Sequence, residues 1–280
     1  MKLLRVGQKG QEKPAALDKD GKIRDISSHI SDLNPDHLNF ETISKLQSAD
    51  LAGLPEISSS ERIGSCITKP GKFIAIGLNF SDHAAETGAE VPSEPITFMK
   101  ATSCINGPND DIEIVSGSKK LDWEVELGIV IGKHTKHISE AQSQDHILGY
   151  CLVNDISERE WQIEKMGQWV KGKSHDTYGP IGPYLVTKDE IADINNLKMS
   201  LDVNGQRMQT GNTNTMIFNV NVIVSYLSKF MSLQPGDIIT TGTPPGVGMG
   251  MKPQQFLKAG DTMRLSIENL GEQNSKVVAL

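Results

Sequence analysis

The sequence predicts a mainly β protein with a few helices, in the α+β class. Glycine, proline and asparagine recur between short runs rich in valine, isoleucine and leucine, which is the pattern of strands joined by turns. Stretches with a helical pattern are few. Many short strands with turn signals favour a closed or sandwich-like β core over a parallel sheet with crossover helices.

The start of the chain is expected to form a small N-terminal domain, residues 1–68, ahead of a main domain at 69–280. Residues 15–27 (AALDKDGKIRDIS) carry Asp20-Gly21 between short alternating runs and predict a β-hairpin. A polar helical stretch follows this hairpin. Pro70-Gly71 then marks a turn, and the apolar run that begins at Phe73 predicts the first buried strand of the main domain.

Six further strands and three helices are expected in the main domain. The strands are predicted at residues 121–132, 147–155, 181–187, 197–205, 237–242 and 262–271, each apolar and followed by turn residues. The helices are predicted at 81–87, where only a turn or two fits, at 157–169, and at 219–231, the longest with an apolar face.

Composition excludes several classes of function. The net charge is −7 with no basic cluster, so we expect no nucleic-acid partner. No apolar run approaches the ~20 residues of a membrane helix, and the N-terminus lacks a secretory pattern, so we expect a cytoplasmic protein. The cysteines Cys66, Cys104 and Cys151 form no CxxC pair and predict buried free thiols.

Two glutamates share one face of the predicted strand LDWEVELGIVIG. The odd positions from Leu121 to Ile131 are apolar, so Glu124 and Glu126 both point to the other face. Two like charges at this spacing repel, and a bound cation or a shared proton would make the pair favourable. The alternative is a solvated strand face.

A third carboxylate, Asp155, ends the apolar run at 147–155. Ser157 and Glu160 form a capping-box pattern, which predicts that a helix starts directly afterwards. With Glu124 and Glu126, Asp155 would complete an all-oxygen site of the kind that suits Mg²⁺, Mn²⁺ or Ca²⁺. The alternative is that Asp155 only caps the helix.

Three other segments contain candidate catalytic or substrate-binding residues. In GLNFSDHAAETG, His83 and Glu86 are spaced as a base and its orienting carboxylate, or as a surface pair. In WVKGKSHDTYGPIGP, Lys171 and Lys173 stand among glycines, and a lysine here would neutralise an enolate or carboxylate, or lie at the surface. The loop TTGTPPGVGMG offers backbone N–H groups and the Thr243 hydroxyl to an anion.

Taken together, and in this order along the chain, these segments resemble the fumarylacetoacetate hydrolase family from about residue 70 onward. The resemblance implies a mixed β-roll core, a homodimer, and one divalent ion, Mg²⁺ or Mn²⁺, held by Glu124, Glu126 and Asp155. It favours the cation interpretation of the glutamate pair.

The resemblance also implies roles for other residues. His83 and Glu86 would activate water, and Lys173 would stabilise an enolate. Substrate contacts are implied for Phe80, which stands where many members have tyrosine, and for three polar residues, Arg159, Gln162 and Thr243.

The implied reaction is metal-dependent hydrolysis of a carbon–carbon bond in a 2,4-diketo acid, with release of pyruvate or a related 2-keto acid and a second acid. The motif strings look most like members labelled ureidoglycolate lyase or 2,4-diketo-3-deoxy-sugar-acid hydrolase. Alternatives are a lyase giving urea and glyoxylate, an oxaloacetate-type decarboxylase and a dienoate isomerase; a non-catalytic metal-binding scaffold is a further class. In each enzymatic case the substrate is a small anionic 2-keto or 2-hydroxy acid.

Overall fold

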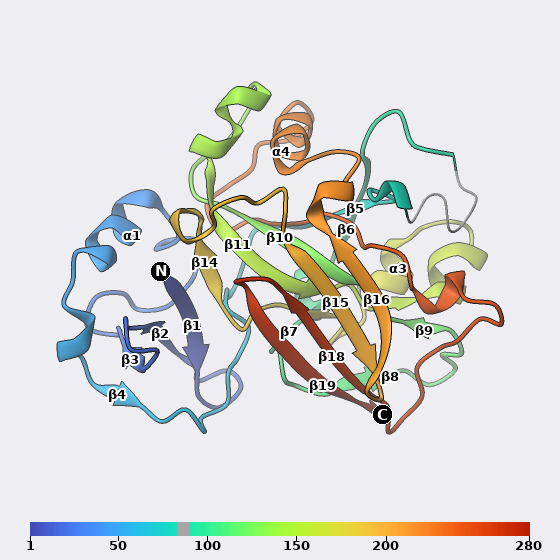
Figure 1. The fold of residues 1–280 in the computed structure, drawn as a ribbon, viewed down its shortest axis with the longest axis horizontal. Coiled ribbons are helices and arrows are strands. Elements are labelled where there is room, and N and C mark those ends of the chain that lie inside the picture. The colour runs from blue at the N-terminus through green and yellow to red at the C-terminus, as the bar shows by residue number, and fades with distance from the viewer. Residues whose placement is uncertain (83–89) are drawn as a thin grey trace.

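The computed structural model describes residues 1–82 and 90–280, and most of its regular structure is β-sheet (Figure 1). The predicted class, mainly β with a few helices, is confirmed. The described residues form a ten-stranded sheet. Its order is β4 (Glu56–Ile57), β3 (Ile23–Asp25), β2 (Lys13–Leu17), β1 (Lys2–Val6), β14 (Leu185–Thr187), β11 (Ile147–Asn154), β10 (Val125–Ile131), β17 (Ile238–Thr240), β5 (Phe73–Gly77) and β6 (Ile96–Lys100).

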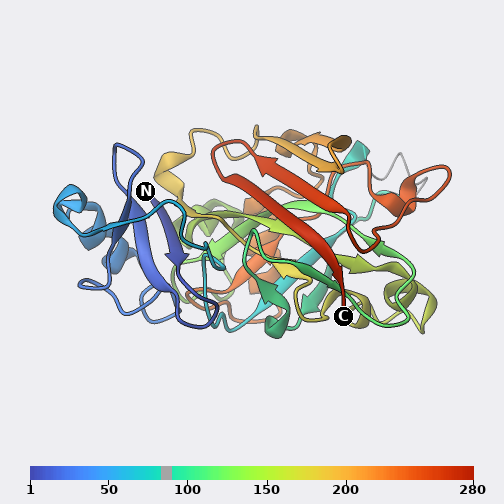
Figure 2. The same ribbon diagram turned by 90° about the horizontal axis from the view of Figure 1, so that it is seen from below.

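A five-stranded sheet packs against the middle of the large one, over β10 and β11 (Figures 1 and 2). Its order is β16 (Gln206–Asn212), β15 (Lys198–Val203), β18 (Thr262–Ile267), β19 (Gly271–Ala279) and β8 (Ile112–Ile114). Two short pairs complete the strands: β12 (Ser157–Glu158) with β9 (Leu121–Asp122), and β13 (Gly179–Pro180) with β7 (Ile105–Asn106). Every residue of β10 and β11 is buried, so these strands carry the core on both faces.

The helices are short and lie around the sheets. In residues 1–82 and 90–280 they are α1 (Phe40–Gln47), α3 (Val170–Lys173), α4 (Val220–Ser228) and a π-helix at Glu160–Glu164. Short 3₁₀-helices occur at Leu51–Gly53, Thr102–Cys104, Glu140–Asp145, Lys188–Glu190, Thr213–Thr215 and Gly248–Gly250. The helix predicted at 219–231 is confirmed as α4, where the Asn219 side chain accepts hydrogen bonds from the first-turn N–H groups.

The N-terminal strands extend the large sheet. The predicted hairpin is confirmed: β2 pairs with β3, and the Asp18 carboxylate accepts hydrogen bonds from the backbone of Asp20 and Lys22 in the turn. β1 pairs antiparallel with β14, so residues on both sides of the predicted boundary at 68 share one sheet. The division into domains 1–68 and 69–280 stays a prediction.

The helix predicted at 157–169 is confirmed only in part. Ser157 and Glu158 form strand β12, the π-helix Glu160–Glu164 follows, and the next helix, α3, begins at Val170. Ser157 Oγ donates to the carbonyl of Asp155 instead of capping a helix. Glu158 is fully buried and accepts hydrogen bonds from Ser118 Oγ and the backbone of Lys120, contacts that hold the segment extended.

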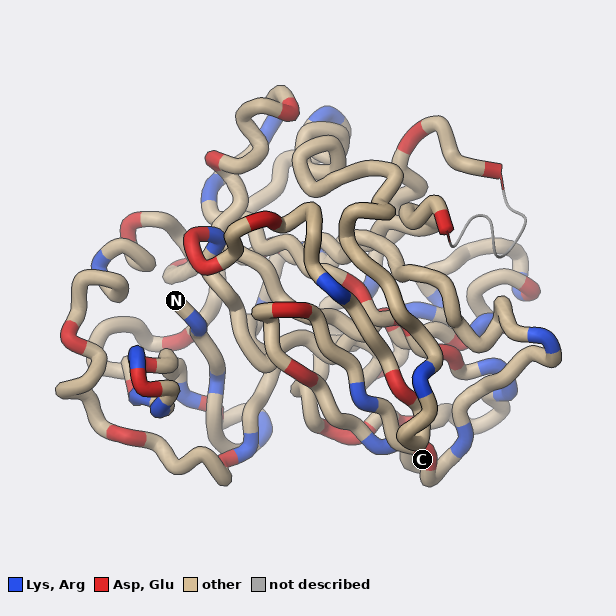
Figure 3. The backbone as a smooth tube through the Cα atoms, viewed as in Figure 1, with Lys and Arg blue, Asp and Glu red and all other residues tan. Residues whose placement is uncertain are grey.

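Charged side chains are mixed over the molecule. Figure 3 shows Lys and Arg interspersed with Asp and Glu along the tube, without a continuous basic stripe. Within the part of the chain that the structure describes, none of the helices has the length and apolar character needed to cross a membrane.

Candidate active site

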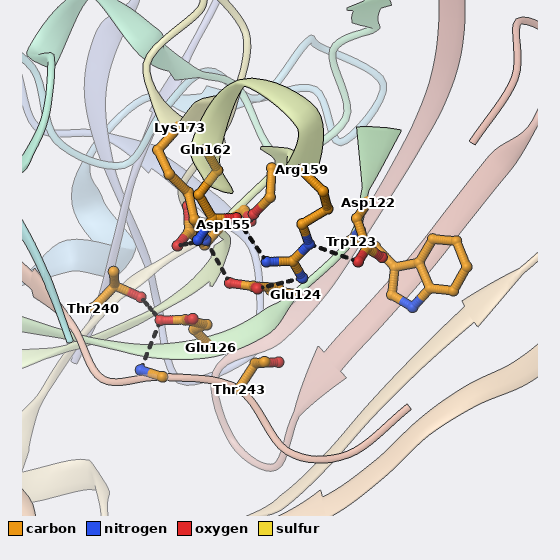
Figure 4. Close-up of polar contacts among 12 residues, drawn as sticks. Asp122, Trp123, Glu124, Glu126, Asp155, Arg159, Gln162, Lys173, Thr240 and Thr243 are labelled. Carbon is orange, nitrogen blue, oxygen red and sulfur yellow. Dashed lines mark hydrogen bonds and ion pairs between the residues drawn. The ribbon is translucent and has the colours of Figure 1, made fainter. Parts of the chain in front are cut away.

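Three carboxylates from two neighbouring strand ends converge on one point (Figure 4). Glu124 lies in the gap between β9 and β10, Glu126 is in β10, and Asp155 directly follows β11. In the antiparallel β10–β11 pair Val125 is opposite Asn154, and the Asp155 N–H donates to the Glu124 carbonyl at 2.9 Å. This register places one carboxylate oxygen of each acid within 4.8 Å of the others.

Two cations bracket Glu124. Lys173 Nζ donates to Glu124 Oε2 at 2.8 Å and to Asp155 Oδ2 at 2.6 Å. The Arg159 guanidinium lies 2.6 Å from Glu124 Oε1 and donates from Nε to Asp122 Oδ2 at 2.8 Å. All of these side chains are buried, so each charge is stabilised by its partners instead of by water.

The two glutamates differ in their partners. Glu126 Oε2 accepts hydrogen bonds from the Thr240 hydroxyl and from the Gly242 N–H at 2.8 Å. Among the described residues, no donor reaches its other oxygen and no lysine or arginine pairs with it. Glu126 is therefore a buried carboxylate with no direct lysine or arginine partner in residues 1–82 and 90–280.

Burial and the neighbouring charges shift the pKa values of Glu124, Glu126 and Lys173. Burial opposes ionisation of Glu124, but Lys173 and Arg159 outweigh burial and hold its pKa below the usual range. Burial raises the pKa of Glu126 well above normal, and the charges of Asp155 and Glu124 raise it further. Burial lowers the pKa of Lys173, but Asp155 and Glu124 reverse the effect and the net shift is upward.

The arrangement fits a divalent cation. The donors are hard carboxylate oxygens, as Mg²⁺ and Mn²⁺ prefer, and the uncompensated Glu126 supplies negative charge in a buried position. A cation beside Glu126 would remove the repulsion that raises its pKa.

A cavity of about 140 Å³ opens beside the three acids. It is lined by the predicted residues Glu124, Glu126, Asp155, Arg159, Gln162, Lys173 and Thr243, and by Ile76, Gly77, Leu78, Phe98, Ile163, Trp169, Gly242 and Met249. Arg159 donates to Gln162 Oε1 at 3.0 Å, and Thr243 Oγ1 donates to the Val125 carbonyl at 2.9 Å. The structure therefore brings seven of the predicted site residues together.

Three predicted residues are not placed at this cavity. His83 and Glu86 lie outside the described residues. Phe80 is fully buried, bridges to Met216, and does not line the cavity. Its implied contact with substrate has no geometric support.

Sequence reasoning missed two charged residues of the site. Asp122 accepts hydrogen bonds from Arg159 and from the N–H groups of Gly248 and Met249; it has the same even parity as the two glutamates, which was a usable signal. Lys100 Nζ donates to Asp155 Oδ1 and to the Lys173 carbonyl, both at 2.5 Å. Lys100 ends an ordinary apolar run, ITFMK, and nothing local indicates its partner.

Comparison with known proteins yields one family. The model of the fumarylacetoacetate (FAA) hydrolase C-terminal domain matches residues 72–278. A protein from Burkholderia ambifaria (strain MC40-6), provisionally named a hydrolase, is 59% identical over 274 residues, which cover 98% of this chain and 97% of that protein.

Solved structures share the whole fold. The fumarylacetoacetate hydrolase of Exiguobacterium antarcticum matches with a TM-score of 0.88 at 33% identity, covering 100% of both chains. A maleylpyruvate hydrolase of Sphingobium sp. SYK-6, in complex with manganese(II) and pyruvate, matches with a TM-score of 0.82 at 28% identity, covering 100% of this chain and 99% of that one. The 2-hydroxyhepta-2,4-diene-1,7-dioate isomerase of Mycobacterium marinum matches with a TM-score of 0.75 at 31% identity, covering 100% and 98%.

Proposed function

Because this chain belongs to the fumarylacetoacetate hydrolase family, we propose that it is a divalent-metal-dependent hydrolase of a 2,4-diketo acid, which cleaves a carbon–carbon bond and releases pyruvate or a related 2-keto acid plus a second acid. The observation that carries the proposal is the buried group Glu124, Glu126 and Asp155 with the Lys173 ammonium beside it. We further propose a cytoplasmic homodimer that acts on a small anionic acid, with no nucleic-acid or membrane partner.

Glu124, Glu126 and Asp155 would hold one Mg²⁺ or Mn²⁺ ion. When bound, such an ion supplies Lewis-acid polarisation of a keto oxygen and a template for the neighbouring carboxylate. The manganese(II) and pyruvate in the compared maleylpyruvate hydrolase support both the ion and the product class.

The chain's own residues would supply the proton transfers and the charge stabilisation. His83, oriented by Glu86, would take a proton from water as its oxygen attacks the second carbonyl carbon of the substrate. The bond to the adjacent methylene carbon then breaks, its electron pair becomes the enolate of the leaving keto acid, and that carbon takes up a proton. Lys173 would stabilise the enolate oxygen, and Arg159, Gln162 and Thr243, which line the cavity, would orient substrate oxygens.

One alternative has a specific observation in its favour. The compared isomerase acts, by its name, on a dienedioate, so isomerisation without bond cleavage is a second candidate at the same site. A ureidoglycolate lyase and an oxaloacetate-type decarboxylase would use the same acids and lysine. A non-catalytic scaffold gives no reason to bury Lys173 among carboxylates that border a cavity.

Product analysis distinguishes these reactions. The protein, freed of metal and reloaded with Mg²⁺ or Mn²⁺, is incubated with a panel of 2,4-diketo acids, ureidoglycolate, oxaloacetate and a dienoate. We expect stoichiometric release of pyruvate and a second acid from a diketo acid, only with metal. Urea and glyoxylate, carbon dioxide, or a rearranged dienoate as the sole product would replace the proposal with the corresponding alternative.

A further inference from the structure

The cavity has a polar group of residues and an apolar group. The polar group contains the three acids together with Lys173, Arg159, Gln162 and Thr243. The apolar group, here called the apolar wall, contains Ile76, Leu78, Phe98, Ile163, Trp169 and Met249. All of the apolar wall except Ile76 is only partly buried, and Ile163 is 46% exposed. Protein atoms therefore leave part of this apolar surface uncovered.

The apolar wall lies next to Lys173, which it contacts through Phe98. Lys173 Nζ lies 5.2 Å from the centroid of the Phe98 ring, and the Phe98 and Trp169 rings meet edge to face at 5.1 Å. A Cβ atom on Gly77 would lie 2.7 Å from the Trp169 ring, so glycine at 77 lets the indole approach β5 closely. Phe98 and then Trp169 therefore continue the cavity lining from Lys173.

Lys173 and Arg159 are the lysine and arginine that line the described part of the cavity, and both belong to its polar group, not to the apolar wall. Lys173 contacts Glu124 and Asp155, and Arg159 contacts Asp122, Glu124 and Gln162. Residues 83–89, outside the described part, contain neither lysine nor arginine. A second carboxylate at the far end of a substrate, on the apolar wall, would therefore lose water without meeting a lysine or arginine of residues 1–82 and 90–280.

We propose that the substrate of this enzyme carries an uncharged, apolar acyl group beyond its diketo acid, which packs on Phe98, Trp169 and Ile163, and that dicarboxylic analogues are poor substrates. This inference rests on the proposed function and adds the substrate's tail to it. Burial of the acyl group on the wall supplies affinity in proportion to the apolar area covered, whereas a tail carboxylate there has no charged partner.

Two substrates of matched shape test whether the enzyme prefers an apolar tail to a charged one. Both are acylpyruvates with the same methylene spacer; one ends in an isopropyl group and the other in a carboxylate. With the Mn²⁺-loaded protein, kcat/KM for pyruvate release should be about tenfold or more higher for the isopropyl compound, since an unpaired buried charge is disfavoured by at least that factor. Equal values, or a preference for the carboxylate, would overturn the inference while pyruvate release from either leaves the proposed function standing.

If neither compound releases pyruvate, the proposed function fails for this substrate class and binding still decides the inference. Dissociation constants of the two compounds on the Mn²⁺-loaded protein are then measured by calorimetry. Tighter binding of the isopropyl compound supports the apolar subsite, and tighter or equal binding of the carboxylate rejects it.

An added cation should reverse the preference. Ile163→Arg places a guanidinium on the apolar wall, and we expect the ratio of kcat/KM values, carboxylate over isopropyl, to rise by about tenfold. Met166→Arg is the matched control, because Met166 is 96% exposed and does not line the cavity; its ratio should equal that of the unmodified protein. Equal ratios in both variants would show that Ile163 does not face the tail.

Discussion

Asp155 is held by cations on both of its carboxylate oxygens. Lys100 binds Oδ1 and Lys173 binds Oδ2, and Lys100 also holds the Lys173 carbonyl. Lys100 and Asp155 are almost completely inaccessible to solvent. The Lys100 ammonium thus connects the end of β6 with the loop after β11 and the end of α3. Lys100 is therefore a positioning residue for Asp155 and Lys173.

Lys100→Met should destabilise the protein and loosen the metal site. Removal of one partner from a buried ion pair costs about 3 kcal/mol or more of unfolding free energy, and Asp155 loses the contact that orients it. Urea denaturation measures the first effect, and Mn²⁺ titration of the folded variant measures the second as weaker affinity. Lys45→Met is the control, because Lys45 pairs with Glu41 at the surface and its loss costs about 0.5 kcal/mol or less.

Glu126 is the proposed ligand with the clearest need for a cation. Glu126→Gln keeps the shape of the side chain but removes its charge, so we expect the rise in Tm produced by Mg²⁺ or Mn²⁺ to disappear. The metal-free variant should be at least as stable as the metal-free parent, because burial and the neighbouring acids oppose ionisation of Glu126. Differential scanning calorimetry with and without metal measures both quantities. Glu61→Gln, on an exposed turn, should retain the full metal-dependent rise, and a persisting rise in Glu126→Gln would refute the ligand assignment.

The elements that sequence reasoning predicted correctly are those whose signal is local. The hairpin was predicted from Asp20-Gly21 in one turn, α4 from its apolar face, and the alternation in β10 from residues two apart. The parity that puts Glu124 and Glu126 on one side is of the same kind, so the glutamate pair was predictable from the strand alone. The choice of a bound cation, and of Asp155 as third ligand instead of a helix cap, came from the family resemblance.

The start of the helix predicted at 157–169 was wrong for the opposite reason. Glu158 is buried against Ser118 and Lys120, about forty positions earlier, and this pairing keeps Ser157 and Glu158 in a strand, so that helical structure begins only after them. Lys100 was missed for the same reason, because its partners Asp155 and Lys173 lie on other elements. Long-range ion pairs leave no periodic signal in a single sequence.

At α3 the close approach of two elements requires glycine. A Cβ atom on Gly172 would lie 2.5 Å from the Gln162 backbone nitrogen and would also overlap the Glu158 carbonyl, so Gly172→Ala should push α3 away from β12 and displace Lys173. We expect a loss of about 1–3 kcal/mol in unfolding free energy together with reduced turnover. Gly53→Ala is the control, since its Cβ would meet only the Asp50 side chain. A Gly172→Ala protein as stable and as active as the parent would contradict the packing described.

At the scale of the whole molecule, the interior is continuous from the N-terminal strands to the five-stranded sheet. One cluster of buried apolar side chains includes residues of β1, β5, β10, β11, β15, β18 and α4. The three cysteines, predicted as buried free thiols, are confirmed as such. Because the thiols lie inside this common core, their ionisation reports on the stability of the fold as a whole.

The folded protein should lose stability in alkaline solution through these thiols. Burial raises the pKa of Cys104 from 9.0 to about 11, so between these values the unfolded chain releases the thiol proton and the native protein retains it. The stabilisation is complete below pH about 9 and is lost as the pH rises to about 11, and a shift of two units corresponds to about 3 kcal/mol. Urea denaturation in the presence of reductant, repeated from pH 8 to 11, measures the decline.

Cys104→Ala separates the thiol from other alkaline titrations. Burial also raises the pKa of Tyr150 and of Cys66, but these groups are present in both proteins and their contributions cancel in the difference. The variant should therefore show a shallower fall in unfolding free energy above pH about 9 and a constant offset below it, where the thiol is protonated in both states. Curves that stay parallel across the whole range would mean that Cys104 titrates equally in the native and unfolded chains, and hence that the core admits water at the end of β6.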